Sequence, residues 1–233
     1  MTADSTSSPD EQPTSLPVCP NGKSDCAIIE QLVEISQSLT ELSQLVPTDQ
    51  LTGLANYRTF RKALVHEMER TQRSGQPTTL IMLDIDHFKN VNDSWGHEIG
   101  NQALVHIAKL LQRTVRRLDI PCRYGGEEFA IILPNTELSA SVLVAERLRQ
   151  IIAETPLLMG EQLLPLTVSL GIDSYRFGEQ TSPEELVQRA DHYLYQAKQK
   201  GRNQVRHTKL PPVEIVSRGE KKCASQPVRQ RRP

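Results

Sequence analysis

The chain has 233 residues, of which 37% are hydrophobic and 24% are charged. Lys and Arg number 27 against 28 Asp and Glu, and the net charge of −1 gives no general attraction to nucleic acid or to an anionic membrane. The four cysteines form neither a C-x-x-C pair nor a cluster with histidine, which argues against a zinc site and a disulfide framework. No apolar run approaches the roughly 20 residues of a membrane-spanning helix. We therefore expect a cytoplasmic protein in a reducing compartment.

Both ends of the chain are predicted to be disordered. Residues 1–27 are rich in Ser, Thr, Pro and Asp and lack the apolar stretch of a secretory signal. They bury too little apolar area to offset the entropy lost on ordering. Residues 208–233 are also rich in proline and end in basic residues. This basic tail is expected to be solvated, although it could also bind an acidic partner.

Residues 28–47 are predicted to form a stalk helix. Their apolar side chains recur at alternating steps of four and three residues, which is the heptad pattern of a coiled coil. The seam consists of Ile28, Leu32, Ile35, Leu39, Leu42 and Val46. Because an isolated helix of about 20 residues is marginally stable in water, we expect the stalk to pair with a second chain. The same stripe could instead fold back onto the domain or dock on a regulatory protein.

Residues 48–207 are predicted to form the folded domain, and three elements fill its first half. Residues 56–74 have the apolar spacing of a helix, with Asn56 as a candidate N-cap. Residues 79–86 are a short apolar run, typical of a strand covered on both faces. Residues 98–115 again show helical spacing.

The second half of the domain begins with a predicted hairpin. Two apolar runs, at residues 120–124 and 129–133, flank a pair of glycines. The pattern then predicts a helix, a strand with a partner near Leu157, and a last helix that starts at Pro183. These three elements span residues 137–154, 163–174 and 183–201. Helices that alternate with a few strands indicate an α/β sheet with helices packed on it.

Acidic residues lie at two positions where a charge is unusual: the end of the buried strand and the diglycine turn. Asp84 and Asp86 end the buried strand, and they share one face because side chains alternate along a strand. A carboxylate there is costly unless a partner or a metal ion compensates its charge. Glu127 and Glu128 follow the glycines at residues 125–126, which allow a ligand to approach the backbone closely.

A metal site follows if the diglycine turn lies beside the end of the Asp84 strand. Asp84 and Glu127 could then hold one or two Mg²⁺ ions, which prefer oxygen ligands and share their shell with water and phosphate. Two ions would stabilise the attacking and leaving oxygens of an in-line displacement. Each motif alone is more typical of a strand-end salt bridge or a plain hairpin. Together they favour a metal-dependent phosphoryl or nucleotidyl transfer.

In their order along the chain, these motifs resemble the GGDEF-domain diguanylate cyclases. Residues 123–129 read Arg-Tyr-Gly-Gly-Glu-Glu-Phe, which is similar to the family signature in its Gly-Gly-Glu-Glu-Phe form. Other stretches similar to the family's motifs are residues 49–54, 84–89, 96–100, 190–191, 195–198 and 201–203.

The resemblance implies a fold and a reaction. The fold is an α+β palm, with a central, mostly antiparallel sheet flanked by helices, related to nucleotidyl cyclases and polymerases. The reaction condenses two GTP into cyclic di-GMP with release of two pyrophosphates. Each domain of a homodimer holds one GTP, and each 3′-hydroxyl attacks the α-phosphate of the other GTP.

The resemblance also implies the metal site. Asp84, Glu127 and the carbonyl oxygen of Ile85 correspond to the ligands of two Mg²⁺ ions, which Mn²⁺ could replace. Glu127 is the expected proton acceptor for the 3′-hydroxyl, because a metal-bound carboxylate stays ionised. Glu128 either assists or forms a structural ion pair, and we interpret Asp86 as structural.

Three cations are expected to bind the triphosphate. Lys89, Lys198 and Arg202 match the family's cationic positions and would offset the charge that develops as pyrophosphate leaves. The alternative for Lys198 and Arg202 is an ordinary pair of exposed cations at a helix C-terminus.

Asn92 resembles the guanine-binding residue of the family, with His97 nearby. The second such residue is usually Asp, and this chain has Asn101 there. Because a neutral acceptor binds guanine more weakly than a charged one, we expect GTP to remain preferred over ATP by a reduced margin. A second departure is Tyr57, where the family usually has Arg, and this change could alter how the stalk joins the domain.

Arg116 and Asp119 have the spacing of the family's product-inhibition motif, Arg-x-x-Asp, and Arg147 is a candidate third member. Arg suits this role because its planar fork pairs with phosphate and guanine edges. The resemblance thus implies cyclic di-GMP as both product and inhibitor. Control is expected through this site, through the stalk, or through a regulatory protein that binds residues 28–46. The alternatives are a non-catalytic cyclic di-GMP receptor and a hybrid cyclic dinucleotide synthase with relaxed base selection.

Overall fold

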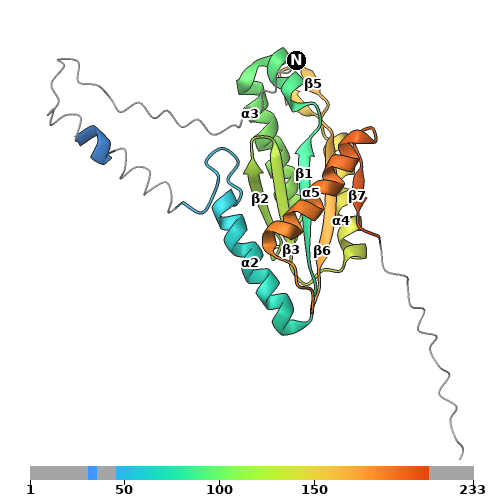
Figure 1. The fold of residues 1–233 in the computed structure, drawn as a ribbon. Coiled ribbons are helices and arrows are strands. Elements are labelled where there is room, and N and C mark those ends of the chain that lie inside the picture. Colours follow the sequence, from blue (N-terminus) through green and yellow to red (C-terminus); the bar gives the residue numbers. More distant parts are fainter. Residues whose placement is uncertain (1–30, 36–45, 210–233) are drawn as a thin grey trace, which may run out of the picture.

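The computed structural model describes residues 31–35 and 46–209 (Figure 1). Residues 31–35 are helical. The rest of the predicted stalk up to residue 45, the predicted disordered segment 1–27 and the tail beyond residue 209 lie outside the described residues. Within the described ranges, no helix combines the length and the apolar character that a bilayer span requires.

A five-stranded sheet forms the centre of the domain, in the order β2-β3-β1-β6-β7. The middle strand β1 (Thr78–Ile85) is antiparallel to β3 (Glu128–Leu133) and to β6 (Val168–Tyr175). At the edges, β2 (Ile120–Gly125) pairs antiparallel with β3, and β7 (Val205–His207) pairs parallel with β6. The predicted hairpin and the mostly antiparallel sheet are both confirmed.

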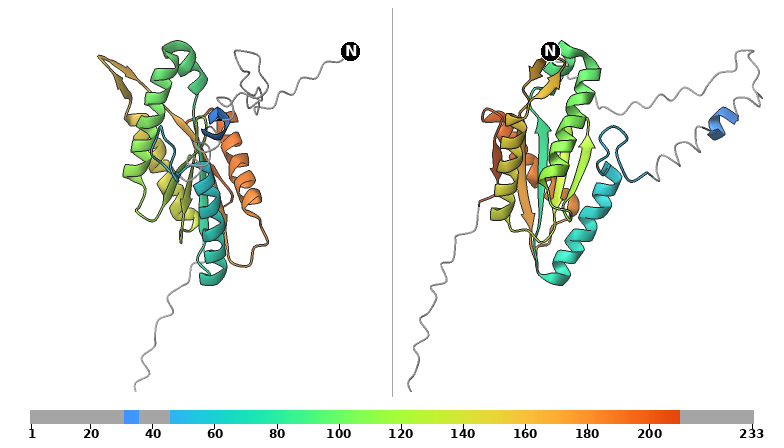
Figure 2. Two further views of the ribbon diagram at one scale, coloured as in Figure 1. Left: turned by 90° about the vertical axis from the view of Figure 1, so that its left-hand side faces the viewer. Right: turned by 180° about the vertical axis from the view of Figure 1, so that it is seen from behind.

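Helices cover both faces of this sheet. One face carries α2 (Tyr57–Ser74) and α5 (Pro183–Gln199), and the other carries α3 (Phe88–Thr114) and α4 (Leu138–Glu154) (Figure 2). All eight residues of β1 are buried, as the apolar run predicts. Its side chains alternate between two cores: Leu80 and Met82 pack on the α2 and α5 side, and Ile81, Leu83 and Ile85 pack on the α3 and α4 side.

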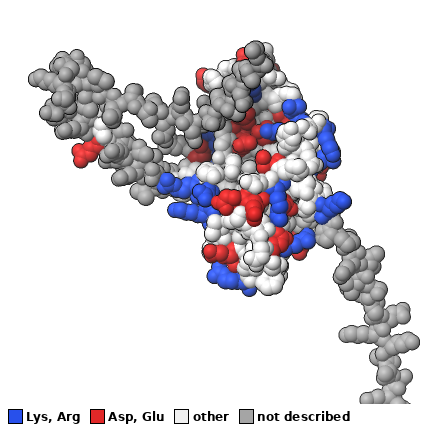
Figure 3. Space-filling view, in the orientation of Figure 1, with Lys and Arg blue, Asp and Glu red and all other residues white. Residues whose placement is uncertain are grey.

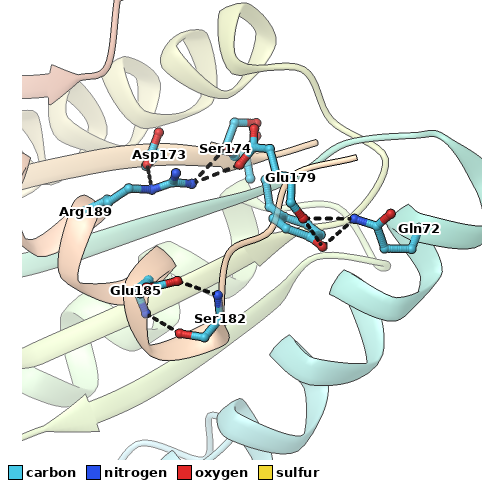
Figure 4. Close-up of polar contacts among 9 residues, drawn as sticks. Gln72, Asp173, Ser174, Glu179, Ser182, Glu185 and Arg189 are labelled. Atoms are coloured by element: carbon cyan, nitrogen blue, oxygen red, sulfur yellow. Dashed lines mark hydrogen bonds and ion pairs between the residues drawn. The ribbon is translucent and has the colours of Figure 1, made fainter. Parts of the chain in front are cut away.

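Local signals in the sequence fix where the helices begin and how closely they pack. The Asn56 side chain accepts a hydrogen bond from the Thr59 N–H at 3.0 Å and caps α2. At the start of α5, Ser182 and Glu185 exchange hydrogen bonds of 3.1 and 2.8 Å in a capping box (Figure 4). Gly171 on β6 lets α5 approach, because a Cβ there would overlap the α5 backbone. This close packing sets the position of the α5 C-terminal half over the sheet.

The structure corrects two predictions about the elements and adds one strand. Helix α3 begins at Phe88, ten residues before the predicted start, and passes through a kink at Gly96, whose φ is 80°. The predicted strand 163–174 is two strands in different sheets, because Pro165 lacks the N–H that a continuous ladder needs. Its first part, β5 (Gln162–Leu164), pairs with β4 (Leu157–Met159), which confirms the partner near Leu157. The short strand β7 was not predicted.

Candidate active site

The end of β1 and the diglycine turn lie side by side. Asp84 is in register with Glu128 across the β1–β3 pair. One residue further, the Ile85 N–H donates to the carbonyl oxygen of Glu127 at 3.4 Å. The turn that brings Glu127 here needs glycine, because Gly126 has a φ of 38°. The backbone therefore places the diglycine turn beside the end of the Asp84 strand, as a site shared by Asp84 and Glu127 requires.

Negative charge is concentrated at this point. The Nζ atom of Lys198, from α5, lies 2.8 Å from the Asp84 carboxylate. Burial raises the pKa of Asp84, Lys198 opposes this effect, and the charges of Glu127 and Asp86 add to it. Burial likewise raises the pKa of Glu128, and the neighbouring Asp84 raises it further. A further cation beside Lys198 would therefore be electrostatically favourable here.

These oxygen donors fit a hard divalent cation whose coordination shell is completed by the substrate. Among the residues that the structure describes, no three His, Cys, Asp or Glu side chains converge on one point as a protein-only metal site. Asp84 and Glu127 supply two carboxylates, and Ile85, whose carbonyl is the third predicted ligand, follows Asp84 in the chain and bonds Glu127 through its N–H. Mg²⁺ is commonly held by one or two carboxylates together with water and phosphate oxygens.

Asp86 is occupied by protein donors. Its carboxylate accepts hydrogen bonds from the Ser169 hydroxyl at 2.6 Å, the Thr167 hydroxyl at 2.8 Å and the Asn203 N–H at 2.9 Å. Because Ser169 is in register with Asp84, Asp86 lies on the same face of the sheet as Asp84. Three donors on a buried carboxylate agree with the structural interpretation of this residue.

The three predicted phosphate-binding cations belong to α3, to α5 and to the loop that follows α5. Lys198 contacts Asp84 directly from α5. Arg202 lies in the loop after α5, next to the Asn203 amide that binds Asp86. Lys89 is exposed in the first turn of α3, where unpaired backbone N–H groups also favour an anion.

The predicted base-binding residues lie on the two segments of α3. Asn92 is half-buried on the first segment, and a Cβ at Gly100 would overlap its side-chain oxygen. Gly100 therefore makes room for Asn92, and this packing brings Asn92 close to Asn101 in the next segment. Asn101 is exposed and lines a groove of about 370 Å³ that also includes Leu51. His97 is exposed directly after the kink.

The three residues predicted for product inhibition also gather together. The Arg116 N–H donates to the Asp119 carboxylate at 2.8 Å in the turn between α3 and β2. Burial raises the pKa of Asp119, and the charges of Arg116 and Arg147 oppose this shift, so both cations lie near it. Arg147 reaches over from α4 to the Thr114 carbonyl oxygen at 2.8 Å.

Sequence reasoning missed a connection between the diglycine turn and the start of the domain. Arg123 donates to the Gly126 carbonyl oxygen at 2.9 and 3.0 Å and pairs with Asp49 at 3.2 Å. Asp49 in turn accepts from the Thr52 N–H at 2.8 Å. The only signal in the sequence was that Asp49 and Arg123 carry opposite charges in two separate motifs, and neither residue had an assigned role.

The aromatic residue that departs from the family pattern belongs to the same region. The ring centroid of Tyr57 lies 5.0 Å from that of Tyr124, edge to face, and Phe60 completes the cluster. Tyr124 directly precedes the diglycine turn. Tyr57 therefore packs the start of α2 against the strand residue that precedes the diglycine turn.

A larger cavity, of about 660 Å³, lies at the far end of β6 and is lined by charged residues such as Asp173, Glu179 and Arg189. These charges pair with one another, since Arg189 contacts both acids (Figure 4). Acidic and basic side chains are also interspersed over the surface seen in Figure 3, where neither sign forms a continuous field. This cavity therefore offers paired charges, whereas the Asp84 site has an excess of carboxylates.

Comparisons with known proteins agree with this geometry. The family described as "Diguanylate cyclase, GGDEF domain" matches residues 46–204. The response regulator PleD of Caulobacter vibrioides is 42% identical over 173 residues, which are 73% of this chain and 38% of PleD. Diguanylate cyclase A of Treponema denticola is 37% identical over 180 residues, which are 76% of this chain and 48% of that protein. The chain thus spans less than half the length of these two relatives.

Solved structures confirm the predicted fold class. The diguanylate cyclase SiaD of Pseudomonas aeruginosa, solved in complex with its activator SiaC, is 38% identical with a TM-score of 0.67, and the match covers 78% of this chain and 69% of SiaD. The GGDEF domain of DgcB from Caulobacter crescentus, solved in complex with c-di-GMP, is 36% identical with a TM-score of 0.66. That match covers 70% of this chain and 95% of the DgcB domain.

Proposed function

Because the chain belongs to the GGDEF-domain family of diguanylate cyclases, we propose that it condenses two GTP into cyclic di-GMP and releases two pyrophosphates. The observation that carries this proposal is the convergence of Asp84 and the Glu127 turn at the end of β1, with Lys198 paired to Asp84. An intact Gly-Gly-Glu-Glu-Phe signature at residues 125–129 supports it.

Asp84, Glu127 and the Ile85 carbonyl oxygen would hold Mg²⁺, two ions in the family pattern, with Mn²⁺ as a substitute. Such ions neutralise phosphate charge and activate the attacking hydroxyl. Glu127 would accept the proton of the 3′-hydroxyl. Glu128, whose pKa is raised by burial and by Asp84, would contribute to the charge balance of the site.

The cations would act on the phosphate groups. Lys198 already lies 2.8 Å from Asp84, so it is within reach of a phosphate bound beside that carboxylate. Lys89 and Arg202 would bind the remaining phosphates from the start of α3 and from the loop after α5. Fixed positive charges of this kind stabilise the pyrophosphate as it leaves.

Guanine would be recognised by Asn92 and Asn101, with His97 close by. Guanine offers the N1–H and N2–H donors and the O6 acceptor. An amide side chain can accept one donor and donate to O6, so guanine remains the preferred base. The exchange of a charged acceptor for Asn101 weakens this preference.

Activity would require two chains, because each domain supplies one GTP. Cyclic di-GMP would inhibit at Arg116, Asp119 and Arg147. A regulatory protein would act on the stalk at residues 28–46, as supported by the similarity to SiaD, which was solved with an activator. A partner that binds only the paired state stabilises pairing by mass action.

The experiment that tests the proposed function is a product analysis. Purified protein is incubated with Mg²⁺ and GTP, ATP or both, and the products are identified by mass spectrometry. Cyclic di-GMP from GTP is the expected product. Binding of cyclic di-GMP without synthesis would instead identify a receptor, which the grouping at Asp119 favours as the second candidate. A mixed dinucleotide would identify a hybrid synthase, the outcome that Asn101 favours.

A further inference from the structure

The loop that carries Arg202 is held in a strained conformation. Three consecutive residues have positive φ: Gly201 at 109°, Arg202 at 60° and Asn203 at 42°. Glycine adopts this region freely and asparagine tolerates it, but arginine does so at a cost. A strained backbone of this kind persists where neighbouring groups fix it from several sides.

Hydrogen bonds from three elements fix this loop. The Arg202 N–H donates to the Ala197 carbonyl oxygen of α5 at 3.0 Å. The Asn203 side-chain oxygen accepts from Arg149 of α4 at 3.0 Å. The Asn203 N–H donates to the Asp86 carboxylate at 2.9 Å, and this bond joins the loop to the end of β1.

Asp86 is itself firmly placed. Asp86 as a whole is 6% exposed, and its carboxylate is held by the hydroxyls of Thr167 and Ser169, at the start of β6. Its hydrogen bonds therefore link the end of β1 to the start of β6 and to the residues that precede β7. It is also two residues from Asp84, so any shift of one strand end moves the metal-binding carboxylate and the loop anchor together.

We propose that Asp86 is a positioning residue, which holds the loop of residues 201–203 so that the Arg202 guanidinium meets the phosphates of GTP. This inference rests on the proposed function. The end of β1 then places two groups at once. Asp84 binds the cation, and Asp86 fixes the distance from that cation to Arg202. The role differs from simple packing, since it acts on nucleotide affinity through one other residue.

Three substitutions separate this role from a general loss of structure. Asp86→Ala removes the acceptor for the Asn203 N–H. Asp86→Asn keeps an oxygen of the same shape for that N–H and should rescue the position of the loop. Thr167→Val removes one hydroxyl donor from the same carboxylate oxygen and leaves the bond to the loop. If Asp86→Ala does not fold, Asp86→Ser replaces it, because its shorter side chain cannot reach the loop amide.

The decisive readout is a double-mutant cycle on the affinity for α,β-methylene GTP in the presence of Mg²⁺. We expect Asp86→Ala and Arg202→Ala each to weaken binding about tenfold, the effect of losing a charged hydrogen-bond partner. If Asp86 acts through Arg202, the double variant binds no more than about twofold more weakly than Arg202→Ala alone. Effects that multiply to about a hundredfold would overturn the proposal. Thr167→Val and Asp86→Asn should remain within about threefold of wild type.

Hydrogen exchange provides an outcome that is independent of catalysis. The Asn203 amide should exchange faster in Asp86→Ala than in wild type, Asp86→Asn or Thr167→Val. Unchanged exchange would overturn the proposal even if the affinities change. If wild type makes no cyclic dinucleotide, the proposed function fails, whereas the exchange data still decide whether Asp86 holds the loop.

Discussion

At the scale of single residues, the carboxylates of Asp84 and Asp86 differ in their hydrogen-bond and ion-pair partners. Asp86 is saturated by protein donors, whereas Asp84 has one lysine partner and lies among other carboxylates that raise its pKa beyond the effect of burial. The apolar pattern places both residues at the same strand end and on the same face, and the sequence shows neither residue's partners. Their partners at β6 and α5 distinguish them, and those partners are more than eighty residues away in the chain.

Asn101 offers a direct test of base selection. Asn101→Asp restores the ionised acceptor of the family, so we predict that the ratio of kcat/KM for GTP to that for ATP rises about tenfold. The measurement is steady-state kinetics with each nucleotide. Gln102→Glu is the control, because it adds the same charge at the neighbouring exposed position of the same groove. An unchanged ratio in Asn101→Asp would show that this residue does not contact the base.

The proposed product-inhibition site predicts variants that lose inhibition and keep their rate of synthesis. Arg116→Ala and Asp119→Ala should raise the concentration of cyclic di-GMP that gives half-maximal inhibition by at least about tenfold, because each removes a charged hydrogen-bond partner. The initial rate without product should stay within about twofold. Arg117→Ala, an exposed neighbour, serves as the control for charge. Identical inhibition curves for all four proteins would remove this site from the mechanism.

At the scale of elements, the sequence predicts long, regular segments well and short or interrupted ones poorly. The α2 start at Asn56 and the α5 start at Pro183 were predicted, and the structure shows capping hydrogen bonds at both places. The first segment of α3 was missed because the glycine at position 96 suggests a break, whereas the chain resumes a helix after a single kink. Strand β7 has three residues, too few for a periodic signal, and its pairing with β6 is decided by tertiary contact.

The same limit applies to the connections between elements. Asp49 and Arg123 are 74 positions apart, so their ion pair brings together two motifs that sequence reasoning treated separately. Through Arg123, the loop at the start of the domain is bonded to the Gly126 carbonyl oxygen of the diglycine turn. The side chain of Asn56, in turn, donates to the Val46 carbonyl oxygen at 2.8 Å, which joins the segment before the domain to the start of α2.

This ion pair has a defined pH dependence. Burial alone would raise the pKa of Asp49, but hydrogen bonds from Thr52 and the Arg123 charge outweigh it and lower the pKa. Since the folded pKa lies below the unfolded value of about 3.9, the stabilisation is complete above that pH and is lost as the pH falls through the folded value. We predict that Asp49→Asn lowers the free energy of unfolding by about 1 kcal/mol at neutral pH.

The measurement is urea unfolding of wild type and Asp49→Asn at a series of pH values. The difference between the two proteins should shrink below about pH 4. Asp93→Asn, at an exposed position of α3, controls for the loss of one carboxylate. A difference that persists undiminished at low pH would mean that the substituted amide disturbs the loop by its shape and that the charge of Asp49 is irrelevant.

At the scale of the whole molecule, the sheet with its two helical layers would position one GTP in each domain under the proposed function. The proposed catalytic edge at the end of β1 and the proposed product site at the α3–β2 turn belong to different elements of this scaffold. The proposed reaction joins two nucleotides, so the geometry of a single domain is half of the reacting assembly. Synthesis is therefore expected to require pairing of two chains.

Removal of residues 1–45 tests this expectation. Without the stalk, pairing relies on substrate and domain contacts alone, so we predict that synthesis of cyclic di-GMP is lost at nanomolar protein and recovers in part as the protein concentration rises. Fusion of the remaining chain to an unrelated parallel coiled coil should restore activity. Full activity of the shortened chain at the lowest concentration would show that the stalk is not needed for pairing.

The most direct test uses chains that are already paired. Wild type and Glu127→Gln, each fused to a parallel coiled coil, are incubated with GTP and Mg²⁺, and cyclic di-GMP is quantified by mass spectrometry. We predict steady synthesis by the wild-type pair that stops when Mg²⁺ is chelated, and a loss of at least about a hundredfold in Glu127→Gln. Equal synthesis by both pairs, or no cyclic di-GMP from the paired wild type, would contradict a metal site at Asp84 and Glu127.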